Sequence, residues 1–173
     1  RVKGYKSFSN KIWNAANFLN LNNVYFTDTI ENKFIQLDSS KWILKELEVI
    51  QNKYFENIEK YQFHEIASLV YHFIWHTFCD WYIEFIKSDF KDPKKSEETK
   101  KVSGWVFVQI LKLLHPIMPF ITEKLWLSLV DKKTFLMNQK FNQIKFDQTF
   151  NQSKKNILKI IEIMTALRNL RAD

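Results

Sequence analysis

Glycine and proline are scarce in this chain, with two and three copies among 173 residues. Sandwiches and barrels need many tight turns, and these two residues form most of them. Their scarcity therefore favours long helices joined by few connections. Hydrophobic residues make up 46% of the chain and aromatic residues 16%, which is enough material for a buried core. We expect residues 1–173 to form a single all-α domain, an antiparallel helix bundle.

Apolar periodicity divides the chain into six predicted helices. They cover residues 4–20, about 39–59, 63–87, a fourth that begins within 88–101 and ends at 114, 119–129, and 154–173. Ser39 or Ser40 can cap the second helix. His115-Pro116 ends the fourth, because proline disfavours helical backbone in the residue before it, and Pro119 can open the fifth. Residues 131–151 have mixed composition and are predicted to be irregular, with at most one short strand near 134–137.

The third predicted helix, residues 63–87, is apolar around nearly its whole circumference. Phe73, Phe78 and Trp81 lie on one side, while Trp75 and Ile83 lie on others. A helix without a polar face is typical of the centre of a bundle. We therefore expect this helix to be the most buried of the six, with Trp81 in the core.

The chain carries a net charge of +7, and its first 27 residues contain no Asp or Glu. This excess indicates an anionic partner, either nucleic acid or an anionic membrane surface. No run of about 18 apolar residues exists that could cross a membrane, and no signal peptide is visible. The single cysteine, Cys79, excludes an internal disulfide and fits a reducing compartment, so we expect a cytoplasmic protein. The chain starts at Arg1 without Met and stops within a predicted helix, which indicates a piece of a longer protein.

Catalytic signals are weak. His72, His76 and Asp80 recur every four residues along the third helix and could hold zinc or iron, or could form an ordinary solvated stripe. We expect no metal site, because ligands spaced in this way on one helix usually need a second helix to close the site. Neither a glycine-rich phosphate loop nor a Gly-x-Ser-x-Gly turn is present, and Cys79 lies in an aromatic run that is typical of a core. The chain itself is therefore predicted to be non-catalytic.

The first helix carries the best binding signal. Cations that can attract phosphates share its polar face with amides that can bond to base edges or ribose hydroxyls. These residues are Lys3, Lys6, Asn10, Asn14 and Asn17. The absence of carboxylates favours RNA over the alternative of an ordinary solvated face. In the last helix, an apolar stripe continues into Arg168 and Arg171, which could meet an anionic partner or bond to carboxylates of neighbouring helices.

Several segments, in order from end to end, resemble the helical anticodon-binding domain of valyl-tRNA synthetases. They are Gly4-Tyr5-Lys6-Ser7-Phe8, Asn10-Lys11-Ile12-Trp13-Asn14-Ala15-Ala16-Asn17-Phe18, Trp42-Ile43-Leu44, Phe78-Cys79-Asp80-Trp81-Tyr82, Leu114-His115-Pro116-Ile117-Met118-Pro119-Phe120-Ile121-Thr122-Glu123 and Arg168-Asn169-Leu170-Arg171. The Leu-His-Pro segment is shared by related class I synthetases, whereas the segments around Trp13 and Cys79 look specific for valine enzymes. Asn17 and Lys124 depart from the family pattern, which would place Arg and Glu there, and Ser40-Lys41-Trp42 replaces an expected Asp-Arg-Trp.

The resemblance implies a function and partners. The domain would hold the anticodon stem-loop of valine tRNA and would contact the catalytic and C-terminal domains of the same parent chain. ATP with magnesium would act in the absent catalytic domain, and no cofactor is expected in this one. The candidate tRNA-binding residues are Lys3, Lys6, Asn10, Lys11, Asn14, Asn17, Arg168 and Arg171. A related isoleucyl- or leucyl-type synthetase, a helical protein-interaction scaffold and a metal-dependent bundle enzyme remain as alternatives.

Overall fold

The computed structural model describes the backbone of residues 2–31 and 35–172 and the side chains of residues 6–31 and 35–170. Its elements are α1 (Val2–Leu21), α2 (Asp38–Glu59), α3 (Phe63–His72), η2 (Phe73–Tyr82), α4 (Ile83–Asp89), α5 (Ser96–Leu114), α6 (Pro119–Leu129), η3 (Leu136–Asn138) and α7 (Phe150–Ala172). The described residues contain no strand, and η3 is a short 3-10 turn in the region where one strand was allowed. The predicted all-α bundle is confirmed.

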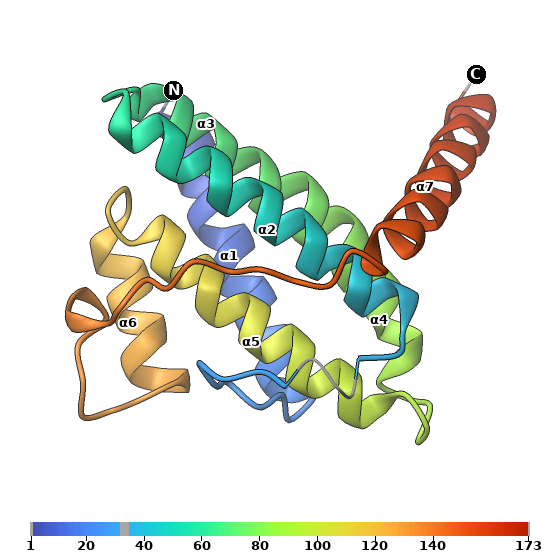
Figure 1. Cartoon of the computed structure of the whole chain (residues 1–173), viewed down its shortest axis with the longest axis horizontal. Helices are drawn as coiled ribbons and strands as arrows, with labels where there is room; N and C mark the ends of the chain where they lie inside the picture. The colour runs from blue at the N-terminus through green and yellow to red at the C-terminus, as the bar shows by residue number, and fades with distance from the viewer. Residues whose placement is uncertain (1, 32–34, 173) are drawn as a thin grey trace.

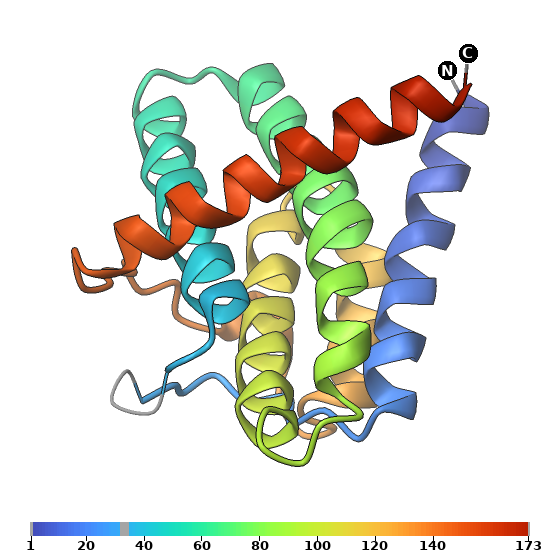
Figure 2. The same ribbon diagram turned by 90° about the vertical axis from the view of Figure 1, so that its right-hand side faces the viewer.

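Helices α1 to α6 pack side by side, and α7 packs across the outside of α2 and then diverges from the bundle, with Arg168 reaching back to Trp81 of η2 (Figure 1). Helices α2 and α3 run in opposite directions, since only the turn 60–62 separates them. The start of α7 is tied to α2 by two contacts. The Ser153 hydroxyl donates to Asp38 at 2.6 Å, and the Lys154 ammonium lies 3.2 Å from Glu46. Figure 2 shows α7 crossing in front of the other helices.

The most buried helix is α5, so the expectation that residues 63–87 occupy the centre is wrong. Every residue from 102 to 114 in α5 is buried, because α1, α2, α4 and α6 all contact this helix. The α3–η2–α4 rod instead has an outer side. On this side Tyr71 is exposed, and Trp75 and Trp81 are only half-buried. Its outward-facing aromatic residues are partly covered by charged side chains of α1 and α7.

The rod formed by α3, η2 and α4 also differs from a uniform α-helix. Residues Phe73–Tyr82 form a π-helix, and the amide of Ile83 bonds to the carbonyl of Phe78, five residues earlier. A π-helix is wider than an α-helix and is rare outside functional or strained segments. Hydrophobic periodicity does not distinguish a π-helix from an α-helix when apolar residues surround the whole helix. The sequence therefore predicts the extent of the rod but not that its middle is a π-helix.

Two long connections run along the bundle, the first described over residues 22–31 and 35–37 and the second over residues 131–149. Apart from the short turn η3, their described residues form no regular secondary structure. Their backbone groups bond to helix side chains instead of to a neighbouring strand. The Glu98 carboxylate accepts from the amides of Gln36 and Leu37, both at 2.9 Å. The residue before α2 is Leu37, which provides no side-chain cap. The prediction that Ser39 or Ser40 caps this helix is therefore wrong.

The first connection lies directly on α5 at Gly104. A Cβ atom added to Gly104 would fall 2.0 Å from the Tyr25 carbonyl oxygen. Because no real Cβ tolerates such a contact, any larger residue here would push the connection away from α5. Nearby, the buried Lys112 ammonium bonds to both oxygens of Asp28 at 2.6 and 2.7 Å and to the Lys140 carbonyl at 3.0 Å. This single lysine thus joins both connections to the central helix.

Candidate nucleic-acid interface

The polar face of α1 is open to solvent. Phe8, Ile12 and Leu19 fix its orientation, because they are almost fully buried on the opposite side of the helix. The outward face presents the exposed side chains of Lys6, Asn10, Asn14 and Asn17. Within the described residues, none of these four side chains has a protein partner. The structure therefore brings together one cation and three amides as the sequence predicted, while the Lys3 side chain lies outside the described residues.

Lys11 lies at the edge of this face and contacts η2. Its ammonium pairs with the Asp80 carboxylate and sits 4.1 Å from the centroid of the Trp75 ring. The side chain is about one quarter exposed. Its charge is thus shared with a carboxylate of the same bundle, which weakens its attraction for an outside phosphate relative to Lys6.

The side chains of His72, His76 and Asp80 contact one another in sequence, and Asp80 links η2 to α1 through Lys11. The two imidazole rings stack with their centroids 5.6 Å apart, and His76 Nδ1 lies 3.3 Å from Asp80. Asp80 is held between His76 and Lys11. Within the described residues, no three His, Cys, Asp or Glu side chains converge where a metal ion could sit.

Arg168 ends the apolar stripe of α7 in an exposed position. Its guanidinium carbon lies 4.6 Å from the centroid of the Trp81 ring, which is a cation–π contact. In the described part of the chain, Arg168 makes no ion pair. Its positive charge is therefore positioned by an aromatic ring and not neutralised by a carboxylate. The side chain of Arg171 lies outside the described residues.

Trp13 was missing from the predicted site. It is 39% exposed and projects from the same face of α1 as Asn10 and Asn17, three residues after the first and four before the second. The other five tryptophans of the chain are buried or half-buried. The sequence held a signal, because a helical plot places Trp13 among polar residues, opposite to the core positions.

The thiol of Cys79, a partly buried residue packed against the core, is unsuited to nucleophilic chemistry. Burial raises its pKa to about 12, and the opposing effect of the nearby Lys11 ammonium is smaller. A thiol with this pKa is protonated at neutral pH, and the thiolate is the reactive form. Cys79 therefore belongs to the packing between η2 and its neighbours, as the aromatic run predicted.

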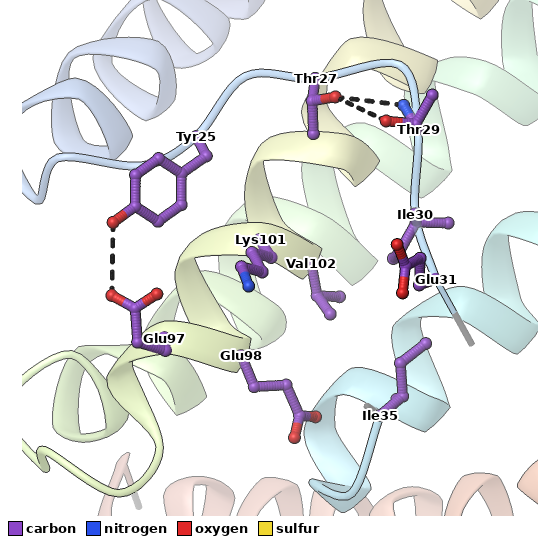
Figure 3. Close-up of a pocket in the computed structure, with 10 residues that line it drawn as sticks. All are labelled: Tyr25, Thr27, Thr29, Ile30, Glu31, Ile35, Glu97, Glu98, Lys101 and Val102. Atoms are coloured by element: carbon purple, nitrogen blue, oxygen red, sulfur yellow. Dashed lines mark hydrogen bonds between the residues drawn. The ribbon is translucent and has the colours of Figure 1, made fainter. Parts of the chain in front are cut away.

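A cavity of about 520 Å³ lies between the first connection and the start of α5 (Figure 3). Three carboxylates, those of Glu31, Glu97 and Glu98, line it together with the ammonium of Lys101. Glu97 accepts a hydrogen bond from the Tyr25 hydroxyl at 3.3 Å, and this interaction raises the pKa of that phenol. The surplus of acid makes this cavity a poor place for phosphate, in contrast to the acid-free face of α1.

Within the described residues, every helix is too short or too polar to span a lipid bilayer. The sequence of residues 40–173 matches the family described as the anticodon-binding domain of tRNA ligase. Valine–tRNA ligases align with nearly the whole chain. That of Pelagibacter ubique is 42% identical over 99% of the chain, that of Zymomonas mobilis 36% over 100%, and that of Brucella suis 34% over 100%. The chain spans about a fifth of the length of each of these relatives. The match to valine enzymes includes α1, which precedes the segment matched by the family.

Proposed function

The chain belongs to the anticodon-binding domain family of tRNA ligases, and we propose that it binds the anticodon stem-loop of valine tRNA as one domain of a valine–tRNA ligase. The observation that carries this proposal is the open polar face of α1, where a free cation and three free amides stand in a stretch without acid. The resemblance to valine enzymes over the full chain supports valine over other amino acids.

The cation and the amides of the α1 face would contribute differently to RNA binding. Lys6 is an exposed, unpaired ammonium that attracts phosphates whatever the base sequence. An amide both donates and accepts hydrogen bonds, whereas an ammonium only donates, so asparagines can distinguish base edges. Unpaired loop bases expose those edges. Lys6 would thus set affinity, and Asn10, Asn14 and Asn17 would set the preference for particular bases.

The remaining predicted residues would contribute less directly to tRNA binding. Arg168, held on Trp81, presents a charge from α7 to the same partner or to another part of the parent chain. Lys11 would contribute only after exchanging Asp80 for phosphate. The Lys3 and Arg171 assignments rest on their positions in the sequence. Attachment of valine to tRNA, with ATP and magnesium, would be the work of the rest of the parent protein, in the cytoplasm.

The proposal is tested by competition binding with valine tRNA transcripts. Valine anticodons share A and C at their second and third positions. We expect the 173-residue chain to bind a transcript with this anticodon more tightly than one with the second or third base changed. A preference for isoleucine or leucine anticodons would assign the domain to a related synthetase. Equal binding to all transcripts, or to none, would support the protein-interaction scaffold instead.

Asn14→Ala should reduce this preference specifically. One good base contact discriminates by about 1–3 kcal/mol, by analogy with duplex recognition. We therefore expect weaker binding to the valine anticodon and nearly unchanged binding to the altered transcript. Asn138→Ala, in the exposed η3 turn, is the matched control and should change neither. Equal weakening of both transcripts by Asn14→Ala would show that Asn14 does not read the anticodon.

A further inference from the structure

Trp13 exposes a large apolar ring in the middle of a polar face. At 39% exposure it lacks the packing that buries Trp42 and Trp126, which are 1% and 2% exposed. Among the described residues no group accepts a hydrogen bond from its indole N–H. Placing an aromatic ring in water has a cost, since burying one normally contributes to stability. Single exposed rings are common on protein surfaces, and Phe135 is more exposed than Trp13. What distinguishes Trp13 is its position among exposed amides and a lysine that have no protein partner in the described residues.

The surroundings of Trp13 indicate what covers it. Asn10, Asn14 and Asn17 are its neighbours on the helix surface, and Lys6 lies on the same face. An apolar protein partner would have to desolvate these polar groups along with the ring, at a cost for each that stayed unpaired. An unpaired nucleobase is different, because its flat face is apolar and its edges carry donors and acceptors. A base can stack on the indole while the asparagines bond to edges and Lys6 meets the phosphate.

We propose that Trp13 is the stacking platform for an unpaired base of the bound RNA, a role that rests on the proposed function and adds a residue to it. Stacking does not depend on which base is present, because every base has an aromatic face. Trp13 therefore holds the loop open against α1, and the asparagines beside it read the edges of the bases that are held. The indole supplies affinity for unpaired RNA, and the amides supply selectivity.

The experiment compares Trp13→Leu and Trp13→Phe with the unchanged chain. The probes are a hairpin carrying the anticodon loop of valine tRNA, the same hairpin with the second anticodon base changed, and a blunt RNA duplex without unpaired bases. Trp13→Leu should weaken both hairpins by the same factor, roughly 5- to 150-fold, the usual loss when one stacked base loses its ring. Binding to the duplex should not change. Trp13→Phe keeps an aromatic face and should recover most of the loss.

Two controls separate stacking from other roles. Phe135→Leu removes an exposed aromatic ring away from α1 and should leave hairpin binding unchanged, and thermal unfolding should show that each variant folds. Hairpin binding should quench tryptophan fluorescence in the unchanged chain, and this quenching should be lost in Trp13→Phe. Unchanged hairpin affinity in Trp13→Leu would overturn the proposal, as would equal losses for hairpins and duplex. The latter result would assign the ring to a general or structural contact.

The same data distinguish this proposal from the function on which it rests. If the unchanged chain prefers neither hairpin, yet Trp13→Leu weakens both and spares the duplex, stacking holds and anticodon selection fails. If the preference is present but Trp13→Leu has no effect, the anticodon assignment holds and the stacking role is refuted.

Discussion

Cys79 offers a direct probe of a single, partly buried group. Its thiol has a pKa near 12 in the folded chain, because burial disfavours the thiolate, against about 8.5 in an unfolded chain. A raised pKa in the folded state means that this thiol's contribution to stability is complete below pH 8.5. The contribution declines as pH rises from there toward 12.

We therefore predict that native Cys79 resists alkylation at pH 9, while the chain unfolded in urea reacts readily. The measurement is the rate of iodoacetamide incorporation from pH 7 to pH 11, with and without urea. The folded protein should show a rate that stays low across the range in which the unfolded thiol ionises. Identical pH profiles in the two states would mean that the thiol is accessible and that η2 packs differently.

Individual site residues were partly predictable from the sequence. The exposed amides of α1 followed from periodicity, since residues opposite a run of core positions must face outward. The pairing of Lys11 with Asp80 did not, because the partners are 69 residues apart and only the packing of α1 on η2 joins them. Arg168 contacts the aromatic ring of Trp81, whereas the sequence predicts either a carboxylate or an outside anion as its partner. Local patterns reveal which way a side chain points, and tertiary structure decides what it meets.

At the scale of elements, the location of helices was predictable and their rank in the core was not. All six predicted helices lie within a few residues of observed helical segments, with the largest difference at the start of α7, and Pro119 opens α6 as expected. The helix at the centre of the core is α5, not the third predicted helix. The buried residues 102–114 of α5 include the polar residues Ser103, Gln109 and Lys112. These polar residues are buried because they bond to other groups, such as Thr99 and Asp28. Hydrophobicity alone therefore underestimates the burial of such a helix.

The π-helix η2 should respond unequally to truncation on its two sides. Phe78 is fully buried and packs near the rings of Tyr82 and Phe107, whereas Trp81 is half-buried beneath Arg168. Phe78→Ala should lower the free energy of unfolding by about 3–5 kcal/mol, the usual loss for a core aromatic residue. Trp81→Ala should cost less, about 1–2 kcal/mol. Urea denaturation measures both, and a larger loss for Trp81 would place that ring in the core after all.

On the scale of the whole molecule, residues 131–149 hold to the bundle through polar side chains of the helices. Gln51, with no exposed surface, donates from Nε2 to the Asn142 carbonyl at 3.0 Å and accepts from the Ile144 amide. Three residues earlier on α2, Glu48 accepts from the Phe146 amide at 3.2 Å. The side chains of Ile144 and Phe146 are themselves buried, and the Phe146 ring packs against the ring of Trp105. Helix side chains thus take the place of a partner strand.

Gln51→Met should show how much this arrangement contributes. Methionine has a similar volume but leaves the buried Ile144 amide unpaired, at about 1–3 kcal/mol, and also the partly exposed Asn142 carbonyl, at a smaller cost. We expect the free energy of unfolding to fall by about 2–4 kcal/mol in urea denaturation. Gln143→Met, on the exposed side of the same segment, is the control and should change stability by less than about 0.5 kcal/mol. Equal effects would mean that Gln51 reaches water and that the segment is held by apolar contacts alone.

The attachment of residues 131–149 to α5 and α2 also affects the protein during its synthesis. A ribosome releases α5 well before it releases the segment that covers Trp105 and pairs with Lys112 and Gln51. Throughout that interval the nascent chain carries a nearly complete bundle with one apolar strip and several polar groups still facing water. Exposed surface of this kind promotes aggregation and attracts chaperones. The domain is therefore most vulnerable after α1 to α6 have emerged and before residues 131–149 close over α5 and α2.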